Sequence, residues 1–176
     1  TAAKRIREAK QRLRLAVFFQ MTYPGAPAIY YGDEVGVTGG DDPYNRGPYP
    51  WADRGGSPDL DLLAEFKRLT KLRRDQPVLR HGTLDAPLHA DDHTIVLIRQ
   101  LGDTWAVTAT NNSSAARTVT VSLPAALQSR EFKDALTAGS VKADGRALTF
   151  TVPALFGSVL VSEAAVSASR QATAPH

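Results

Sequence analysis

The residues best suited to chemistry lie between Asp33 and Arg46. Asp33 and Glu34 are adjacent carboxylates, a combination that could serve as an acid and a base. In an extended segment, however, neighbouring side chains point to opposite faces, whereas two carboxylates that act on one bond must flank it. We therefore assign Asp33 and Glu34 a structural role at the end of a short element.

Asp42 and Arg46 are a better candidate pair. Their spacing of four, across Pro43, places a carboxylate and a guanidinium on one side of a tight loop. The carboxylate can accept hydrogen bonds from hydroxyl groups, and the guanidinium can donate to others. Nearby aromatic residues, among them Tyr44, could stack on sugar rings. A carbohydrate-binding loop and an ion pair that only shapes the loop both fit, and the two interpretations are compatible.

A metal site is not expected. Asp41, Asp42, Asn45 and Gly47 resemble a calcium loop poorly, because Pro43 replaces a ligand and no Glu closes the pattern. The two histidines of the HADDH turn at residues 89–93 lack a clustered third ligand. No glycine-rich phosphate loop is present in the sequence, so no cofactor is expected.

Composition narrows the class of protein. Hydrophobic residues make up 43% and charged residues 22% of 176 residues, with a net charge of +3, which is typical of a globular domain. No apolar run approaches the roughly 20 residues of a membrane helix. The basic residues of the first segment are not interleaved with aromatics, which argues against nucleic acid. The absence of cysteine fits any redox compartment, so the localisation stays open.

Two helices and a short strand organise the first half. Apolar residues with helical spacing, from Ile6 to Met21, predict a helix over 2–21. A proline-glycine turn and Gly32 bound the run Ala28–Tyr31, which predicts a buried strand, and we expect Trp51 to be buried under the loop that follows. Ser57, followed by Pro58 and Asp59, predicts the N-cap of a second helix that ends before Pro77.

After about residue 80 the pattern changes to short strands separated by turns. Evenly spaced short strands predict an antiparallel sandwich. The chain beyond about residue 163 is rich in Ala and Ser and is expected to be a frayed tail. The candidate strands are 83–88, 94–100, 105–111, 118–123, 131–136, 147–152 and 157–162.

The motifs of the first half also resemble a known family. The run PGAPAIYYGDE at residues 24–34, followed by GGDDPYNR at 39–46 and then by Trp51, is similar to the end of the catalytic barrel in the alpha-amylase family of glycoside hydrolases. The resemblance is greatest to cyclomaltodextrinases, neopullulanases and maltogenic amylases. It is specific over roughly the first half of the chain and rests on pattern alone over the rest.

The resemblance implies a fold and an organisation. Residues 1–78 would be the last helix-strand-helix of a TIM-type (β/α)8 barrel, with Ile29–Tyr31 in its eighth strand, and residues 79–163 would be an all-β antiparallel sandwich. Residues 164–176 would be a disordered tail. Asp42 and Arg46 would bind a glucose unit on the non-reducing side of the scissile bond, although Gly47 replaces a second basic residue found in many relatives.

The implied activity is hydrolysis of α-1,4-glucosidic bonds, with retention, in cyclodextrins, maltooligosaccharides, pullulan or starch. The family's catalytic carboxylates lie on earlier barrel strands, so no catalytic residue is expected in this chain, and alone it should be inactive. The rest of the barrel is the expected partner of residues 1–78. The alternatives are that these residues associate with another copy of the chain or that they are poorly ordered. Alternatives are a transglycosylase or isomerase acting on maltose or trehalose, and a non-catalytic β-sandwich module for carbohydrate binding or an interface.

Overall fold

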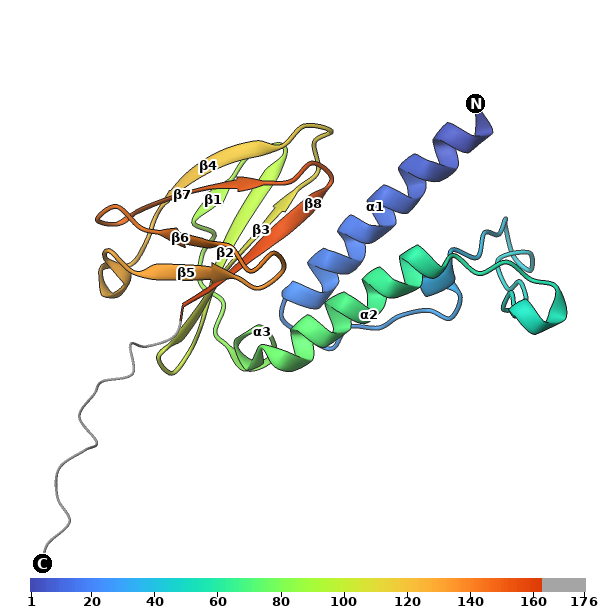
Figure 1. Ribbon diagram of the computed structural model, residues 1–176, viewed down its shortest axis with the longest axis horizontal. Coiled ribbons are helices and arrows are strands. Elements are labelled where there is room, and N and C mark those ends of the chain that lie inside the picture. Colours follow the sequence, from blue (N-terminus) through green and yellow to red (C-terminus); the bar gives the residue numbers. More distant parts are fainter. Residues whose placement is uncertain (163–176) are drawn as a thin grey trace, which may run out of the picture.

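The computed structural model describes residues 1–162, and the predicted tail at 164–176 lies outside this range. Helices α1 (Ala2–Thr22), α2 (Leu60–Asp75) and α3 (Pro77–His81) lie beside an antiparallel β-structure (Figure 1). Short 3-10 turns are η1 (Asp33–Val35), η2 (Ala52–Arg54) and η3 (Ala125–Leu127). The strands are β1 (His89–Ala90), β2 (Thr94–Leu101), β3 (Thr104–Asn111), β4 (Arg117–Ser122), β5 (Glu131–Asp134), β6 (Ser140–Lys142), β7 (Ala147–Val152) and β8 (Phe156–Ser162).

The strands form two sheets, and every pair is antiparallel. The larger sheet has the order β1-β2-β3-β8-β5-β6, and β4 pairs with β7 in a second, two-stranded sheet. The register of β3 against β8 runs from Trp105 opposite Ser162 to Asn111 opposite Phe156. The predicted antiparallel β-structure is therefore confirmed, with a two-stranded second layer.

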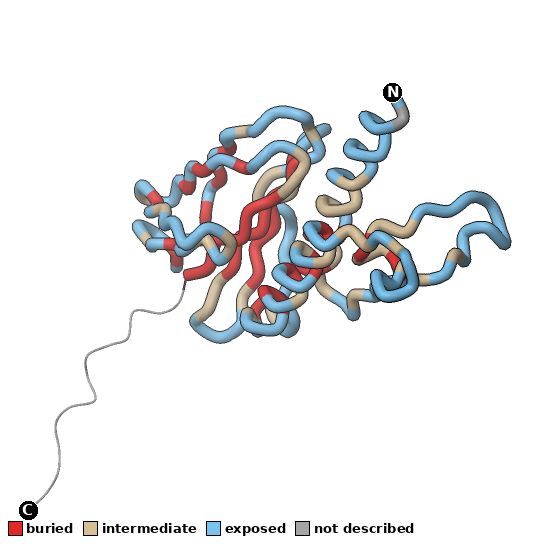
Figure 2. Tube along the Cα trace, turned by 45° about the vertical axis from the view of Figure 1, so that its right-hand side comes forward, coloured by how far each residue is buried: buried red, intermediate tan, exposed pale blue. Residues whose placement is uncertain are grey.

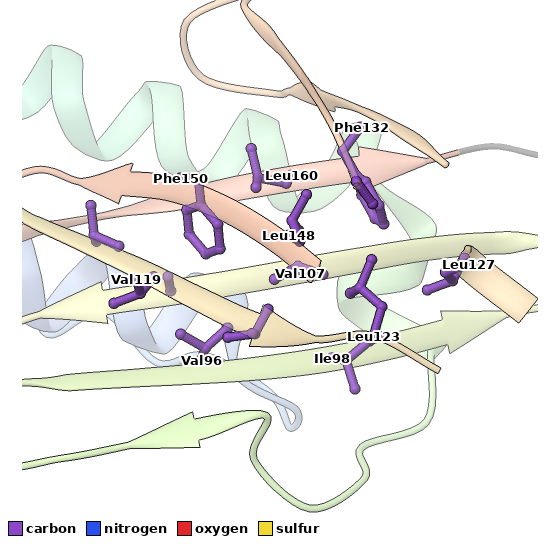
Figure 3. Packing of buried hydrophobic residues seen from close by; sticks show 14 residues of the cluster. Val96, Ile98, Val107, Val119, Leu123, Leu127, Phe132, Leu148, Phe150 and Leu160 are labelled. Atoms are coloured by element: carbon purple, nitrogen blue, oxygen red, sulfur yellow. The ribbon is translucent and has the colours of Figure 1, made fainter. Parts of the chain in front are cut away.

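Two apolar cores lie on opposite faces of the larger sheet. The inner face packs on β4 and β7, where Val107, Leu148, Phe150 and Leu160 are among the buried residues (Figure 3). The other face packs on the helices through side chains such as Ala106 and Val159. The alternation of the two cores along β3 and β8 follows from the period of two in a strand.

Helix α1 approaches the sheet closely at one glycine. Phe18 is fully buried, and its ring centroid lies 5.0 Å from that of Phe156. A Cβ atom at Gly157 would lie 2.0 Å from Cε1 of Phe18 and 2.4 Å from the carbonyl oxygen of Ala109. Only glycine at this position lets the Phe18 ring lie against the sheet backbone.

Two expected strands are not present in the described residues. The segment 28–31 is unpaired, because no strand of the described residues lies beside it. The expected strand at 83–88 is also absent. Thr83 N–H donates to Gln100 and Leu88 N–H to Val96, but Pro87 has no N–H to continue a ladder.

Helix boundaries and short elements account for the other differences. Asp59 and not Ser57 caps α2, since its side chain accepts from the Leu62 N–H. Pro77 follows the end of α2 as expected, and it also begins the unpredicted α3, a position that proline favours. Strand β5 ends at Asp134 instead of residue 136, because the Asp134 carboxylate accepts from Leu136 N–H and forms a turn. Strands β1 and β6 were not predicted.

Candidate functional site

The Asp42–Arg46 pair lies on a loop that projects from the helices. The segment between η1 and α2 extends past the start of α2 and is largely exposed (Figures 1 and 2). Arg46 Nη2 lies 2.9 Å from Asp42 Oδ1, and both side chains are 66% exposed. The two side chains that the sequence selected are therefore in contact and are open to a ligand.

Backbone hydrogen bonds hold the pair in a tight turn. Tyr44 N–H donates to the backbone carbonyl of Asp41 at 2.7 Å, and Arg46 N–H donates to the backbone carbonyl of Pro43 at 3.1 Å. On the other side of the turn, a Cβ atom at Gly39 would lie 2.8 Å from the Asn45 Cα. The turn thus fixes the direction of both charged side chains without burying them.

Aromatic side chains surround the same segment. Tyr30 and Tyr31 contact each other with ring centroids 4.8 Å apart, and Tyr49 and Trp51 do so at 4.4 Å. Tyr44 stands alone and is 78% exposed. Trp51 was expected to be buried under the loop, but it is 56% exposed and contacts the ring of Tyr49. Exposed aromatic faces of this kind can stack on sugar rings.

Tyr31 connects the aromatic segment to the loop. Its hydroxyl donates to the Gly47 carbonyl at 3.2 Å, next to Arg46. Partial burial of the hydroxyl raises the pKa of Tyr31, and the neighbouring Tyr30 raises it further. The hydroxyl therefore remains a protonated donor at neutral pH, which suits it to holding the loop.

Asp33 and Glu34 occupy the turn after the tyrosines. A Glu34 carboxylate oxygen accepts from Gly32 N–H at 2.9 Å, and Gly32 has a φ of 93°, the left-handed conformation that glycine favours. Partial burial raises the pKa of Asp33, and the charge of Glu34 adds to this effect. These contacts fit the structural role expected for both carboxylates.

The sequence alone did not single out two other residues that position this region. Arg73 is buried and donates to backbone carbonyls at the start of the segment. Its spacing from Phe66 and Leu69 places it on the apolar face of α2, and this was the signal that could have revealed it. Lys10 of α1 forms an ion pair with Asp59 at 2.5 Å, which holds the far end of the loop against α1.

Residues 1–162 contain no group of three or more side chains that could hold a metal ion, and no helix among them has the length and apolar character to cross a membrane. A hollow of about 820 Å³ lies elsewhere, between the end of α2 and β5, and its lining includes Gln76, Lys133, Asp134 and Ser162. It shares no lining residue with the Asp42–Arg46 loop.

The chain is similar to α-glucan-degrading enzymes over most of its length. It is 34% identical over 175 residues to an amylopullulanase of Thermoanaerobacterium saccharolyticum, covering 92% of this chain and 13% of that protein. It is 32% identical over 151 residues to neopullulanase 2 of Thermoactinomyces vulgaris, covering 85% of this chain and 25% of that protein. No protein-family model matches the chain.

Solved structures give the same result. An alpha-amylase of Geobacillus thermoleovorans, solved with acarbose, superposes with a TM-score of 0.77 at 29% identity, over 88% of this chain and 33% of that one. A cyclomaltodextrinase superposes with a TM-score of 0.72 at 29% identity, over 88% of this chain and 26% of that one. The chain thus spans a third or less of these proteins.

These similarities define the class. The chain is similar over most of its length to glycoside hydrolases of the alpha-amylase family, and its antiparallel β-structure matches the carboxyl-terminal domains of that family. Within the family, the relatives that it matches carry the names amylopullulanase, neopullulanase and cyclomaltodextrinase, and its short coverage of them is consistent with a carboxyl-terminal portion of such an enzyme.

Proposed function

We propose that this chain is part of a retaining α-glucan hydrolase that acts on α-1,4-glucosidic bonds in cyclodextrins, maltooligosaccharides, pullulan or starch. The chain contributes a substrate-binding loop, and the catalytic carboxylates lie in the part of the enzyme that precedes it. The proposal rests chiefly on the exposed Asp42–Arg46 ion pair, 2.9 Å across, within an aromatic loop. The names of the relatives supply the substrate class.

The chemistry of the pair suits a glucose unit. A carboxylate accepts from two adjacent hydroxyls, while the guanidinium donates through several N–H groups in a fixed plane. Because both side chains are 66% exposed, their mutual attraction is screened by water and contributes little to stability. The pair can therefore exchange part of its internal contact for sugar hydroxyls at small cost.

We propose further that residues 1–78 form the last helix-strand-helix of a (β/α)8 barrel and that residues 79–163 form its carboxyl-terminal β-domain. Ile29, Tyr30 and Tyr31 are 41%, 55% and 47% exposed, an unusual state for an apolar run between two helices. A barrel strand is hydrogen-bonded on both sides. The upstream strands of the complete enzyme would supply both neighbours and cover these side chains, and a second copy of the chain is the alternative cover.

Kinetics of the complete polypeptide test the substrate role. In Asp42→Ala and Arg46→Ala, we expect kcat/KM on long maltooligosaccharides to fall by the equivalent of about 1–3 kcal/mol, the usual loss for a charged hydrogen bond. Arg54→Ala is the matched control, because it removes the same charge from the same exposed loop. Unchanged kinetics in the first two variants, or an equal loss in the control, would remove the pair from the substrate site.

Product identification separates the family's activities. Hydrolysis releases a reducing end for every bond cleaved, whereas a transglycosylase or isomerase conserves the number of glucosidic bonds. We expect the complete polypeptide to release reducing ends from cyclodextrin, pullulan or starch. If maltooligosaccharide binding persisted without any turnover of these substrates, the chain would instead belong to a non-catalytic carbohydrate-binding module.

A further inference from the structure

Two arginines are buried in the core between the helices and the sheet. Arg99 on β2 is 1% exposed, and Arg73 on α2 is 7% exposed. They come from the two halves of the chain, yet their guanidinium groups share an acceptor, because both donate to the Leu79 carbonyl of α3 at 3.0 Å. They therefore form one polar centre, which we call the arginine pair.

Arg73 holds the end of α1 and the turn that follows it. Its Nη1 donates to the backbone carbonyls of Met21 at 2.8 Å and Tyr23 at 3.0 Å. Its Nη2 donates to the Gly25 carbonyl at 2.6 Å. Gly25 has a φ of 109° and lies in the proline-glycine turn that begins the exposed segment.

Arg99 attaches the sheet to the same place. Its Nη1 donates to Thr22, the last residue of α1, at 3.3 Å. Its Nε and Nη2 donate to Thr83 at 2.7 Å and to Gly82 at 2.6 Å, in the connection that follows α3. The guanidinium thereby joins β2 to the ends of two helices.

The acceptors are suited to a buried cation. Helix ends leave carbonyl groups without partners, and positive charge is favourable near the carboxyl terminus of a helix. Burial lowers the pKa of both arginines, with Arg80 adding to the effect on Arg73 and Arg73 to that on Arg99. A guanidinium keeps its charge under such a shift, because it is the most strongly basic of the protein side chains. A planar group with five donors matches this array, which an ammonium group cannot do.

Further contacts lead from the arginine pair to the Asp42–Arg46 loop. Gln20 Nε2 donates to the Ala28 carbonyl at 2.7 Å, which holds the segment three residues beyond Gly25. Tyr31 then donates to Gly47, the neighbour of Arg46. Arg73 near the end of α2 and Gln20 near the end of α1 thus hold the beginning of the exposed segment, and Tyr31 links this part to the Asp42–Arg46 loop.

We propose that Arg73 is a positioning residue for the substrate loop, and that Arg99 extends this positioning to the β-domain. This inference rests on the proposed function of the loop. It gives the antiparallel sheet a role in the reaction, since Arg99 on β2 donates to Thr22 at the end of α1 and shares the Leu79 acceptor with Arg73. Arg73 touches no substrate and acts through the backbone of residues 21–25.

The test compares Arg73→Lys with Arg74→Lys in the complete polypeptide. Arg74 is the adjacent residue on α2, and its side chain is 73% exposed, so it controls for the loss of a guanidinium at this helix end. We expect Arg73→Lys to lower kcat/KM on long maltooligosaccharides about tenfold to a hundredfold, the range for a displaced binding group. The loss should appear mainly in KM and should be smaller on short substrates, while Arg74→Lys stays unchanged.

Hydrogen exchange gives a readout that does not need activity. We expect amides of residues 26–35 to exchange about tenfold faster in Arg73→Lys, as local opening becomes easier, with no change in Arg74→Lys. A lower Tm with equal losses on long and short substrates and unchanged exchange in this segment would overturn the proposal and leave Arg73 a purely structural residue.

Activity and hydrogen exchange together distinguish a failure of the proposed function from a failure of the positioning role of Arg73. If the wild-type complete polypeptide fails to act on α-glucans, the proposed function fails, and the exchange data alone decide whether Arg73 positions the segment. If Arg73→Lys does not fold, Gln20→Ala replaces it, because Gln20 is partly exposed and holds the same segment. Gln20→Ala should then show the same faster exchange and the same dependence on substrate length to a smaller degree, and the absence of both would overturn the proposal.

Discussion

The β-structure and the segment from Pro24 to Pro58 use their apolar side chains in opposite ways. In the strands, apolar residues alternate into two cores, and Phe132, Leu148 and Val107 are fully buried. The segment is largely exposed (Figure 2). Val35 is its one buried large apolar residue, while Tyr44 and Trp51 are exposed. The strands bury their apolar side chains within the chain, whereas the segment leaves its aromatic side chains exposed to a binding partner.

The comparison teaches which part of the chain carries stability and which carries recognition. Each buried aromatic or aliphatic side chain contributes about 1.5–3 kcal/mol by leaving water. The exposed aromatics of the segment contribute little of this, and grouped exposed aromatic side chains mark interaction sites. Substitutions in the two regions should therefore separate loss of stability from loss of binding.

The largest stability effect is expected where the helices meet the sheet. Phe18→Ala should lower the free energy of unfolding of the complete polypeptide by about 3–5 kcal/mol, since it leaves a cavity against Gly157 and Phe156. Denaturant unfolding measures this change. Tyr44→Ala removes a similar aromatic area from the exposed segment and should change stability by less than about 0.5 kcal/mol; equal losses in the two variants would break the comparison.

A smaller effect is expected at Asp59, where the segment joins α2. Its carboxylate accepts from Leu62 N–H at 2.9 Å and also contacts Lys10 of α1. Asp59→Ala should cost about 1–2 kcal/mol, the usual loss for a helix N-cap plus a partly buried contact. Ser57→Ala is the matched control, because Ser57 was the cap that the sequence suggested. Thermal unfolding should give this variant the same Tm as the unsubstituted protein.

The same carboxylate makes stability depend on pH. The hydrogen bond from Lys10, and then that from Leu62 N–H, lowers the pKa of Asp59 below its ordinary value of 3.8. The folded form therefore binds a proton less readily than the unfolded chain, so this contribution is complete above pH 3.8 and is lost as the pH falls through the lower folded pKa. Asp59→Asn should flatten the fall in Tm below pH 4, and an identical pH profile would contradict this.

The smallest stability effect is expected at the Asp42–Arg46 pair. Because both partners are 66% exposed, the double variant Asp42→Ala/Arg46→Ala should shift the free energy of unfolding by no more than about 0.5 kcal/mol. Denaturant unfolding beside maltooligosaccharide binding measures both properties on one protein. A large loss of stability together with unchanged binding would show that the pair only shapes the loop.

Periodicity was sufficient to predict the elements whose partners lie within the chain. The helical spacing from Ile6 to Met21 gave α1 almost to the residue, and the runs 94–100, 147–152 and 157–162 match strands. Local spacing did not distinguish Ser57 from Asp59 as the N-cap of α2, because serine and aspartate are both favoured at that position. The choice depends on Lys10, which is 49 residues away in sequence.

The candidate site could be predicted only in part, for a related reason. The spacing of Asp42 and Arg46 indicated their contact correctly. The expected strand at Ile29–Tyr31 depended on partners that the described residues do not contain, and a strand needs a neighbour to satisfy its backbone. The arginine pair depends on carbonyls gathered from α1, α3 and the turns that follow these two helices, which no single stretch of sequence brings together.

The most direct test is a structure of the complete polypeptide with a bound maltooligosaccharide. We predict that Ile29–Tyr31 pairs in parallel with strands on both sides, and that Asp42 and Arg46 lie within hydrogen-bond distance of one glucose unit. If those residues remained unpaired at the surface and the sugar lay far from Arg46, neither the barrel assignment nor the substrate loop could be maintained.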